Sequence, residues 1–221
     1  MKKSLLLLAC ALLHVGGYLL AQSPVRFAND IHTIREYDKI YAPPPHPVLF
    51  VGSSSIRKWD DLERNFSRYV VLNRGFGGAE TNDVTFFANS IIFPYAPRQI
   101  VIYVGENDLP AANVNADTLL QRFTRLYTRI RAELPGIPLI YISIKPSPSR
   151  AAYFDKAQQS NALIKQFLAG EKNTVFVDIY SKMLDKKGQP RKELFLDDML
   201  HMNKQGYAIW EKAIQPYLLP N

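Results

Sequence analysis

Residues 48–57 read VLFVGSSSIR. A continuous apolar run with β-branched and aromatic residues predicts a strand buried on both faces, and the serines after it favour a turn into a helix. Four further apolar runs follow along the chain, and segments with helical spacing separate them. This alternation is typical of a parallel sheet whose strands are joined by crossover helices.

The expected strands cover residues 48–52, 69–73, 99–104, 138–144 and 174–178. The expected helices cover residues 29–40, ahead of the first strand, and then 56–66, 82–90, 116–134, 151–169 and 203–218. We predict an α/β fold, a three-layer α/β/α sandwich around a five-stranded parallel sheet with the flavodoxin-like order 2-1-3-4-5. Ligands of such sheets bind beyond the carboxyl ends of the strands, near the switch in strand order.

The chain has 221 residues, of which 47% are hydrophobic and 21% charged. These values are typical of one globular domain and exclude a disordered, collagen-like or disulfide-stapled chain. The apolar run from Leu5 to Leu20 follows two lysines and ends at Ala21, which predicts a secretory signal over 1–21 and one domain over 22–221. A lipoprotein anchored at Cys10 is the less favoured alternative, because processing there would divide the apolar run.

Export predicts a secreted or periplasmic protein without a stable membrane anchor. Removing Lys2 and Lys3 with the leader lowers the formal net charge from +7 to +5. The densest basic stretch, 122–131, lies on a helix whose opposite face is apolar, so we interpret it as a solvated surface and expect no nucleic-acid partner. The only cysteine, Cys10, lies within the predicted signal. We therefore expect the mature protein to contain no thiol nucleophile and no thiolate metal ligand.

Three histidines remain, and one of them lies where a strand-end site would be. His32 is on the helix before the first strand, and His46 lies among prolines ahead of that strand. His201 follows the last strand, with Asp198 three residues before it, a spacing that lets a carboxylate orient an imidazole base. Asp197, four residues before His201, is the less favoured partner.

Other strand ends carry hydroxyl groups, glycines and an amide. Ser53, Ser54 and Ser55 stand at the first strand-to-helix turn, where a serine acts as a nucleophile or only as a helix cap. The second strand is followed by NRGFGG at 73–78, and the third by GEND at 105–108. Glycine amides and an asparagine side chain are suited to binding an oxyanion. With the predicted strand order, both loops flank the serine turn.

Rival motifs fail on spacing. A dinucleotide-binding fingerprint would need a third glycine where Glu80 stands. The sequence has no phosphate-binding loop, no paired-histidine zinc motif and no G-x-S-x-G elbow. We therefore expect no metal and no cofactor.

Four blocks of the sequence resemble those of the SGNH, or GDSL, family of serine esterases. They are FVGSSSI at 50–56, NRGFGG at 73–78, GEND at 105–108 and DMLH at 198–201. The resemblance extends over residues 48–218 and is to the branch that contains platelet-activating-factor acetylhydrolase-like proteins and carbohydrate acetylesterases. It is specific because the blocks occur together and each falls at a strand end.

The resemblance implies the role of each residue in these blocks. It places the nucleophile at Ser54, and the other two members of the catalytic triad at Asp198 and His201. It also implies an oxyanion hole formed by the amides of Ser54 and Gly78 and by the side chain of Asn107. Ser53 stands where the family name has Asp, a position outside the triad.

We therefore expect a secreted serine esterase that hydrolyses short-chain, in particular acetyl, esters of small molecules or glycans. Short polar loops at the strand ends predict an open cleft that buries little of a long acyl chain. A lysophospholipase or thioesterase of the same fold, and a non-catalytic carbohydrate-binding protein, are the alternatives.

Four polar residues to which the resemblance assigns no role require an interpretation. Arg74, Lys145 and Arg150 lie near strand ends, where they either line the cleft or brace loops. Asn161 interrupts the apolar stripe of its helix, and we expect a buried amide bonded to a neighbouring loop rather than a substrate ligand.

Overall fold

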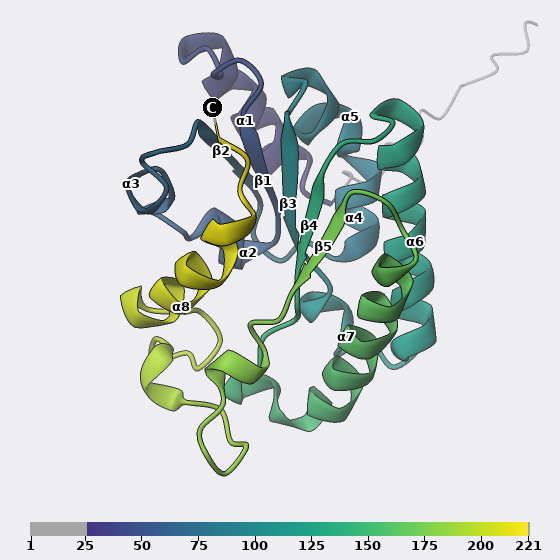
Figure 1. Ribbon diagram of the computed structural model, residues 1–221, viewed down its shortest axis with the longest axis vertical. Coiled ribbons are helices and arrows are strands. Elements are labelled where there is room, and N and C mark those ends of the chain that lie inside the picture. The colour runs from purple at the N-terminus through teal and green to yellow at the C-terminus, as the bar shows by residue number, and fades with distance from the viewer. Residues whose placement is uncertain (1–25, 221) are drawn as a thin grey trace, which may run out of the picture.

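The computed structural model describes residues 26–220, so the predicted leader and Cys10 lie outside the described residues. Five parallel strands form one sheet in the order β2-β1-β3-β4-β5, which confirms the predicted topology. Their bounds are Val48–Gly52 (β1), Val71–Gly75 (β2), Gln99–Tyr103 (β3), Leu139–Ile142 (β4) and Thr174–Val177 (β5). Figure 1 shows the sheet between two layers of helices.

The helices are α1 (Ala28–Ile40), α2 (Ser54–Arg57), α3 (Leu62–Asn65), α4 (Thr81–Phe86), α5 (Ala88–Ile91), α6 (Ala116–Glu133), α7 (Phe154–Ala169) and α8 (Lys204–Ile214). Residues of α1, α4, α5, α6 and α7 pack on one face of the sheet, and residues of α2, α3 and α8 pack on the other. None of the helices within residues 26–220 combines the length and the hydropathy of a membrane-spanning segment.

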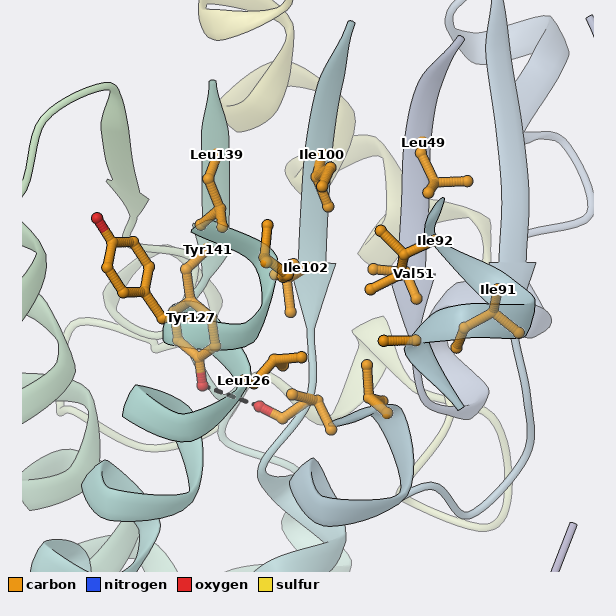
Figure 2. Packing of buried hydrophobic residues seen from close by; sticks show 14 of the residues in the cluster. Leu49, Val51, Ile91, Ile92, Ile100, Ile102, Leu126, Tyr127, Leu139 and Tyr141 are labelled. Carbon is orange, nitrogen blue, oxygen red and sulfur yellow. Dashed lines mark hydrogen bonds between the residues drawn. The ribbon is translucent and has the colours of Figure 1, made fainter. Parts of the chain in front are cut away.

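Alternate strand residues supply the two cores. One set faces α5 and α6, as Figure 2 shows, and consists of Leu49, Val51, Ile100, Ile102, Leu139 and Tyr141. The residues between them face α2, α3 and α8 and include Val48, Phe50, Val101, Tyr103, Ile140 and Ile142. Because each fully buried apolar side chain contributes about 1.5–3 kcal/mol, these central strands hold the sheet rigidly beneath the loops at their ends.

Two helices predicted as continuous are each broken in two. The segment predicted at 56–66 forms α2 and α3, and the one at 82–90 forms α4 and α5. The first break lets Trp59 turn into the core, where its ring packs against Phe50, Phe66 and Trp210. Local spacing could not predict this break, because the aromatic partners are distant in sequence. At the second break, Phe87 stacks edge-on against Phe76.

Candidate active site

Ser54 begins α2 directly after β1, which brings its hydroxyl to the carboxyl edge of the sheet. Two glycines allow this turn. Gly52 has φ +145°, and a Cβ there would lie 1.9 Å from the carbonyl oxygen of Tyr103 on β3. A Cβ on Gly75 would lie 2.5 Å from the amide nitrogen of Arg57. Any larger residue at either position would push the strand ends and α2 apart.

Long-range hydrogen bonds hold the short helix α2 in place. Asn73 on β2 donates its side-chain amide to the carbonyl oxygen of Ile56 at 2.7 Å. Tyr207 on α8 donates its hydroxyl to the carbonyl oxygen of Ser55 at 3.0 Å. A helix of four residues has little stability of its own, so these contacts determine where Ser54 lies.

His201 contacts both Ser54 and Asp198. Its Nε2 lies 3.0 Å from Oγ of Ser54, and its Nδ1 lies 2.5 Å from Oδ2 of Asp198. Because a carboxylate only accepts hydrogen bonds, the proton of the neutral imidazole belongs on Nδ1, and Nε2 is free to accept from the serine hydroxyl. This is the geometry of a serine activated by a general base.

The ionised form of Asp198 is favoured at this position. Burial raises the pKa of Asp198, but hydrogen bonds from the His201 ring and from the amides of His201 and Leu200 outweigh it, and the pKa falls to about 2. The amide bonds reach Oδ1 at 2.8 and 2.9 Å. Asp197 makes no hydrogen bond within residues 26–220, so the structure places Asp198, as expected, against His201.

The loop that carries Asp198 and His201 is closed at its base. An isolated antiparallel bridge pairs Phe195 with Met202, both buried, and the Leu196 amide donates to the His201 carbonyl oxygen at 2.8 Å. Met199 has φ +53°, which is strained for a residue with a side chain. This strained turn brings the carboxylate back over the imidazole.

The opposite side of the site contains the glycine and the asparagine of the predicted oxyanion hole. Gly78 has φ +78°, a conformation that favours glycine, and its carbonyl oxygen accepts from Arg26 at 2.9 Å. The side-chain amide of Asn107 donates to the carbonyl oxygen of Ala79 at 3.0 Å. An amide nitrogen carries two hydrogens, so the second one of Asn107 remains available to a bound oxygen.

Asp108, next to Asn107, connects the loop after β3 to the start of α4. Its side chain is fully buried and accepts from the amide of Thr81 at 2.9 Å, from the Thr81 hydroxyl at 3.1 Å and from Arg122 at 2.6 Å. Burial raises the pKa of Asp108, and the hydrogen bonds from Arg122 and Thr81 offset part of that rise. Arg122 also reaches Glu80 at 3.0 Å, which joins the 78–81 loop to α6.

Residues 50–209 match the model of the GDSL-like lipase/acylhydrolase family. The chain belongs to this family. It is therefore a hydrolase with the esterase or acylhydrolase activity of that family, and the family expected from the four sequence blocks is confirmed. A search of curated protein sequences found no significant match.

Solved structures similar to this GDSL hydrolase support the same fold. A Streptococcus pneumonia protein named for platelet activating factor is 21% identical, with TM-score 0.76, over 86% of this chain and 92% of that one. A GDSL-like lipase from Bacteroides thetaiotaomicron is 20% identical, with TM-score 0.70, over 85% and 96%. An acetylxylan esterase from Geobacillus stearothermophilus is 15% identical, with TM-score 0.62, over 78% and 94%.

The GDSL hydrolase also has a buried ion pair beside the His201 loop. Lys145 contacts Glu106, and both side chains are almost fully buried. Glu106 also accepts from the Tyr103 hydroxyl at 2.9 Å and from the Ser147 hydroxyl at 2.5 Å. Burial lowers the pKa of Lys145 despite the opposing effect of Glu106. Oγ of Ser147 lies 3.4 Å from the carbonyl oxygen of Leu200, so this network adjoins the residue before His201.

Two other polar residues singled out from the sequence of the GDSL hydrolase, Arg74 and Asn161, brace the fold. Arg74 pairs with Asp38 of α1. Asn161 bonds both backbone groups of Ile144, at 2.8 and 3.0 Å, which agrees with the predicted structural amide. Arg150 has no ion pair within residues 26–220, and its Nε is buried without a partner.

The described part of the GDSL hydrolase holds no group of three or more histidine, cysteine or acidic residues that could bind a metal ion. Five of the cavities among residues 26–220, of about 160 to 730 Å³, are lined by residues other than Ser54, Gly78, Asn107 and His201. Ser54 itself is partly exposed.

Proposed function

We propose that this GDSL hydrolase is an exported serine esterase that removes short acyl groups, in particular acetyl, from small-molecule or glycan esters, with 22–221 as its mature domain. The observation that carries the proposal is the unbroken line of contacts from Ser54 through His201 to Asp198. The basic, apolar leader at 1–21 supports export.

In the first half of the reaction, Oγ of Ser54 forms a bond to the ester carbonyl carbon while Nε2 of His201 takes the hydroxyl proton. The tetrahedral intermediate then collapses, the bond to the alcohol oxygen breaks, and the His201 imidazolium gives its proton to the departing alcohol. Asp198 stays ionised, holds the imidazole in orientation and stabilises the positive charge that forms on it.

In the second half, His201 takes a proton from water, and the hydroxide formed attacks the acyl carbon on Ser54. Collapse of this intermediate releases the carboxylic acid and returns the proton to Oγ of Ser54. The developing oxyanion is bound by the amides of Ser54 and Gly78 and by the side chain of Asn107. Loss of one such donor costs a factor of about 10² to 10³ in kcat.

The assignment of Ser54 is tested by substitution within the serine triplet. Ser54→Ala should lower kcat on p-nitrophenyl acetate by about 10⁵ to 10⁶, the loss seen when a nucleophile is removed. Ser55→Ala is the matched control, because Ser55 is buried and its hydroxyl has no hydrogen-bond partner. Equal losses in the two variants, or an active Ser54→Ala enzyme, would contradict the proposal.

The preference for short acyl groups is tested with a series of p-nitrophenyl esters. Each buried CH₂ of an acyl chain contributes about 0.8 kcal/mol, and a partly exposed Ser54 among short loops gives a long chain few places to be buried. kcat/KM should therefore be highest for acetate or butyrate and fall steeply toward laurate. A profile that rises with chain length would favour a lysophospholipase or thioesterase instead.

A further inference from the structure

A groove of about 730 Å³ runs along the β2 edge of the sheet, between α1 on one side and the short helices α2 and α3 on the other. Asn29, Arg57 and Gly75 line it near the serine turn. Tyr37 and Tyr41 line its other end. At 1.5 Å per helical residue, these ends are roughly 18 Å apart along α1. The groove is thus long enough for several units of a polymer.

Arg57 connects this groove to the candidate active site. It lies three residues after Ser54 on α2, and its guanidinium comes within 3.2 Å of the place where a Cβ on Gly77 would be. Gly77 directly precedes Gly78 of the predicted oxyanion hole. Arg57 is exposed and makes no hydrogen bond or ion pair within residues 26–220, so its donors are available to a ligand that leaves the site along the groove.

The far end of the groove presents two exposed aromatic rings. Tyr37 is 60% exposed and Tyr41 is 68% exposed. Their centroids are 6.1 Å apart, and their planes differ by 23°. Two such rings side by side form an exposed apolar patch with hydroxyl groups at its edge, a surface suited to binding a ligand that has both apolar and polar faces.

The charges along the groove nearly cancel. Asp30 and Glu63 line it together with Arg57, while Asp38 and Arg74, which also line it, are paired with each other. A polyanion such as a nucleic acid would meet the carboxylates of Asp30 and Glu63, which make no ion pair within residues 26–220. The lining instead suits an uncharged ligand with many hydroxyl groups, which both acidic and basic side chains can hydrogen-bond.

We propose that this groove binds the glycan chain of an acetylated polysaccharide while one of its acetyl esters lies at Ser54. The inference rests on the proposed esterase function and specifies its substrate class. A pyranose ring presents C–H groups on its faces and hydroxyls around its edge. Its faces can therefore pack on Tyr37 and Tyr41 while its edge bonds polar residues such as Asn29 and Arg57.

The test compares two substrates with one double variant. Tyr37→Ala/Tyr41→Ala should lower the ratio of kcat/KM on acetylated xylan to kcat/KM on p-nitrophenyl acetate by about fivefold to tenfold, the size expected for losing aromatic contacts. Tyr217→Ala is the matched control, since Tyr217 is 47% exposed and lies outside the groove. It should leave the ratio unchanged.

A binding measurement separates this inference from the proposed function. Calorimetry of xylohexaose with Ser54→Ala should detect binding that the additional Tyr37→Ala/Tyr41→Ala changes abolish, even if no ester is hydrolysed. If the double variant keeps both the ratio of kcat/KM values and its hydrolysis of p-nitrophenyl acetate, the proposed glycan groove is wrong while the proposed esterase function still holds. A double variant that loses activity only on laurate esters, or that converts a dimer to a monomer in light scattering, would also overturn it.

Discussion

The Asp198 carboxylate, which contacts His201, is 45% exposed, whereas the Asp108 carboxylate, which binds the opposite loop, is completely buried. The Asp198 carboxylate bonds only to Leu200 and His201 of its own loop within residues 26–220, and this loop contacts other elements through Ser54, Ser147 and Ser149. The Gly78–Asn107 side is held by groups far apart in sequence, among them Thr81, Asp108 and Arg122. Substitutions of Asp198 should therefore have little effect on folding. Substitutions around Asp108 should lower both the catalytic rate and the stability of the fold.

The largest effect is expected from Asp198. Asp198→Asn should lower kcat on p-nitrophenyl acetate by about 10⁴, because an amide there no longer holds the imidazole with its proton on Nδ1. The melting temperature should fall only modestly, because solvent screens the partly exposed carboxylate. Asp197→Asn is the matched control and should stay near the parent rate. A slower enzyme with Asp197→Asn than with Asp198→Asn would reverse the assignment.

A second prediction concerns the buried ion pair. Lys145→Met leaves Glu106 buried without its cation and should destabilise the protein by about 3–5 kcal/mol in urea unfolding. Lys145→Met/Glu106→Gln removes the unpaired charge and should recover most of that loss. Equal stabilities of the single and double variants would show that the pair is not buried as the structure has it.

The local nature of the Asp198–His201 loop explains why the sequence predicted it. Asp and His three residues apart, after the last strand, form a recognisable pattern. The strand order predicted from the apolar runs is confirmed, and it puts the ends of β1, β2 and β3, which Ser54, Gly78 and Asn107 follow, at the same edge of the sheet. The pairing of Asp108 with Arg122, and of Glu106 with Lys145, had no such signal. Each pair joins two elements whose packing depends on the whole sheet, and their charges alone do not identify partners.

The breaks in the helices were missed for the same reason. Residues 56–66 have helical spacing, but the packing of Trp59 against Phe50 and Trp210 outweighs the local preference. Similarly, the positive φ of Met199 could not be read from its identity, because methionine rarely adopts that conformation. In both places, tertiary contacts stabilise a backbone conformation that the local sequence disfavours.

A smaller effect on the buried side should link activity to stability. Thr81→Val removes the hydroxyl that donates to Asp108 and keeps the backbone bond, so we expect a loss of about 1 kcal/mol in urea unfolding together with a lower kcat. Thr85→Val is the matched control, since the Thr85 hydroxyl bonds only to the Thr81 carbonyl oxygen within α4. If kcat is as low with Thr85→Val as with Thr81→Val, the hydrogen bond from Thr81 to Asp108 does not affect catalysis.

The smallest expected effect is in acid. The pKa of Asp198 is about 2 in the folded protein and about 4 when unperturbed, so its charge stabilises the fold fully above pH of about 4. That contribution is lost as the pH falls toward 2. Any difference in melting temperature between the parent and Asp198→Asn should therefore shrink between pH 4 and pH 2. A difference that grows in this range would contradict the lowered pKa.

The central claim, that His201 activates Ser54 as a nucleophile, is tested most directly by covalent labelling. An organophosphonate ester should add one phosphonyl group per chain, and mass spectrometry of the digested protein should locate it on Ser54. With His201→Ala, the labelling rate should fall by several orders of magnitude while the melting temperature stays near that of the parent. Labelling at Ser53 or Ser55, or an equal rate without His201, would contradict the account.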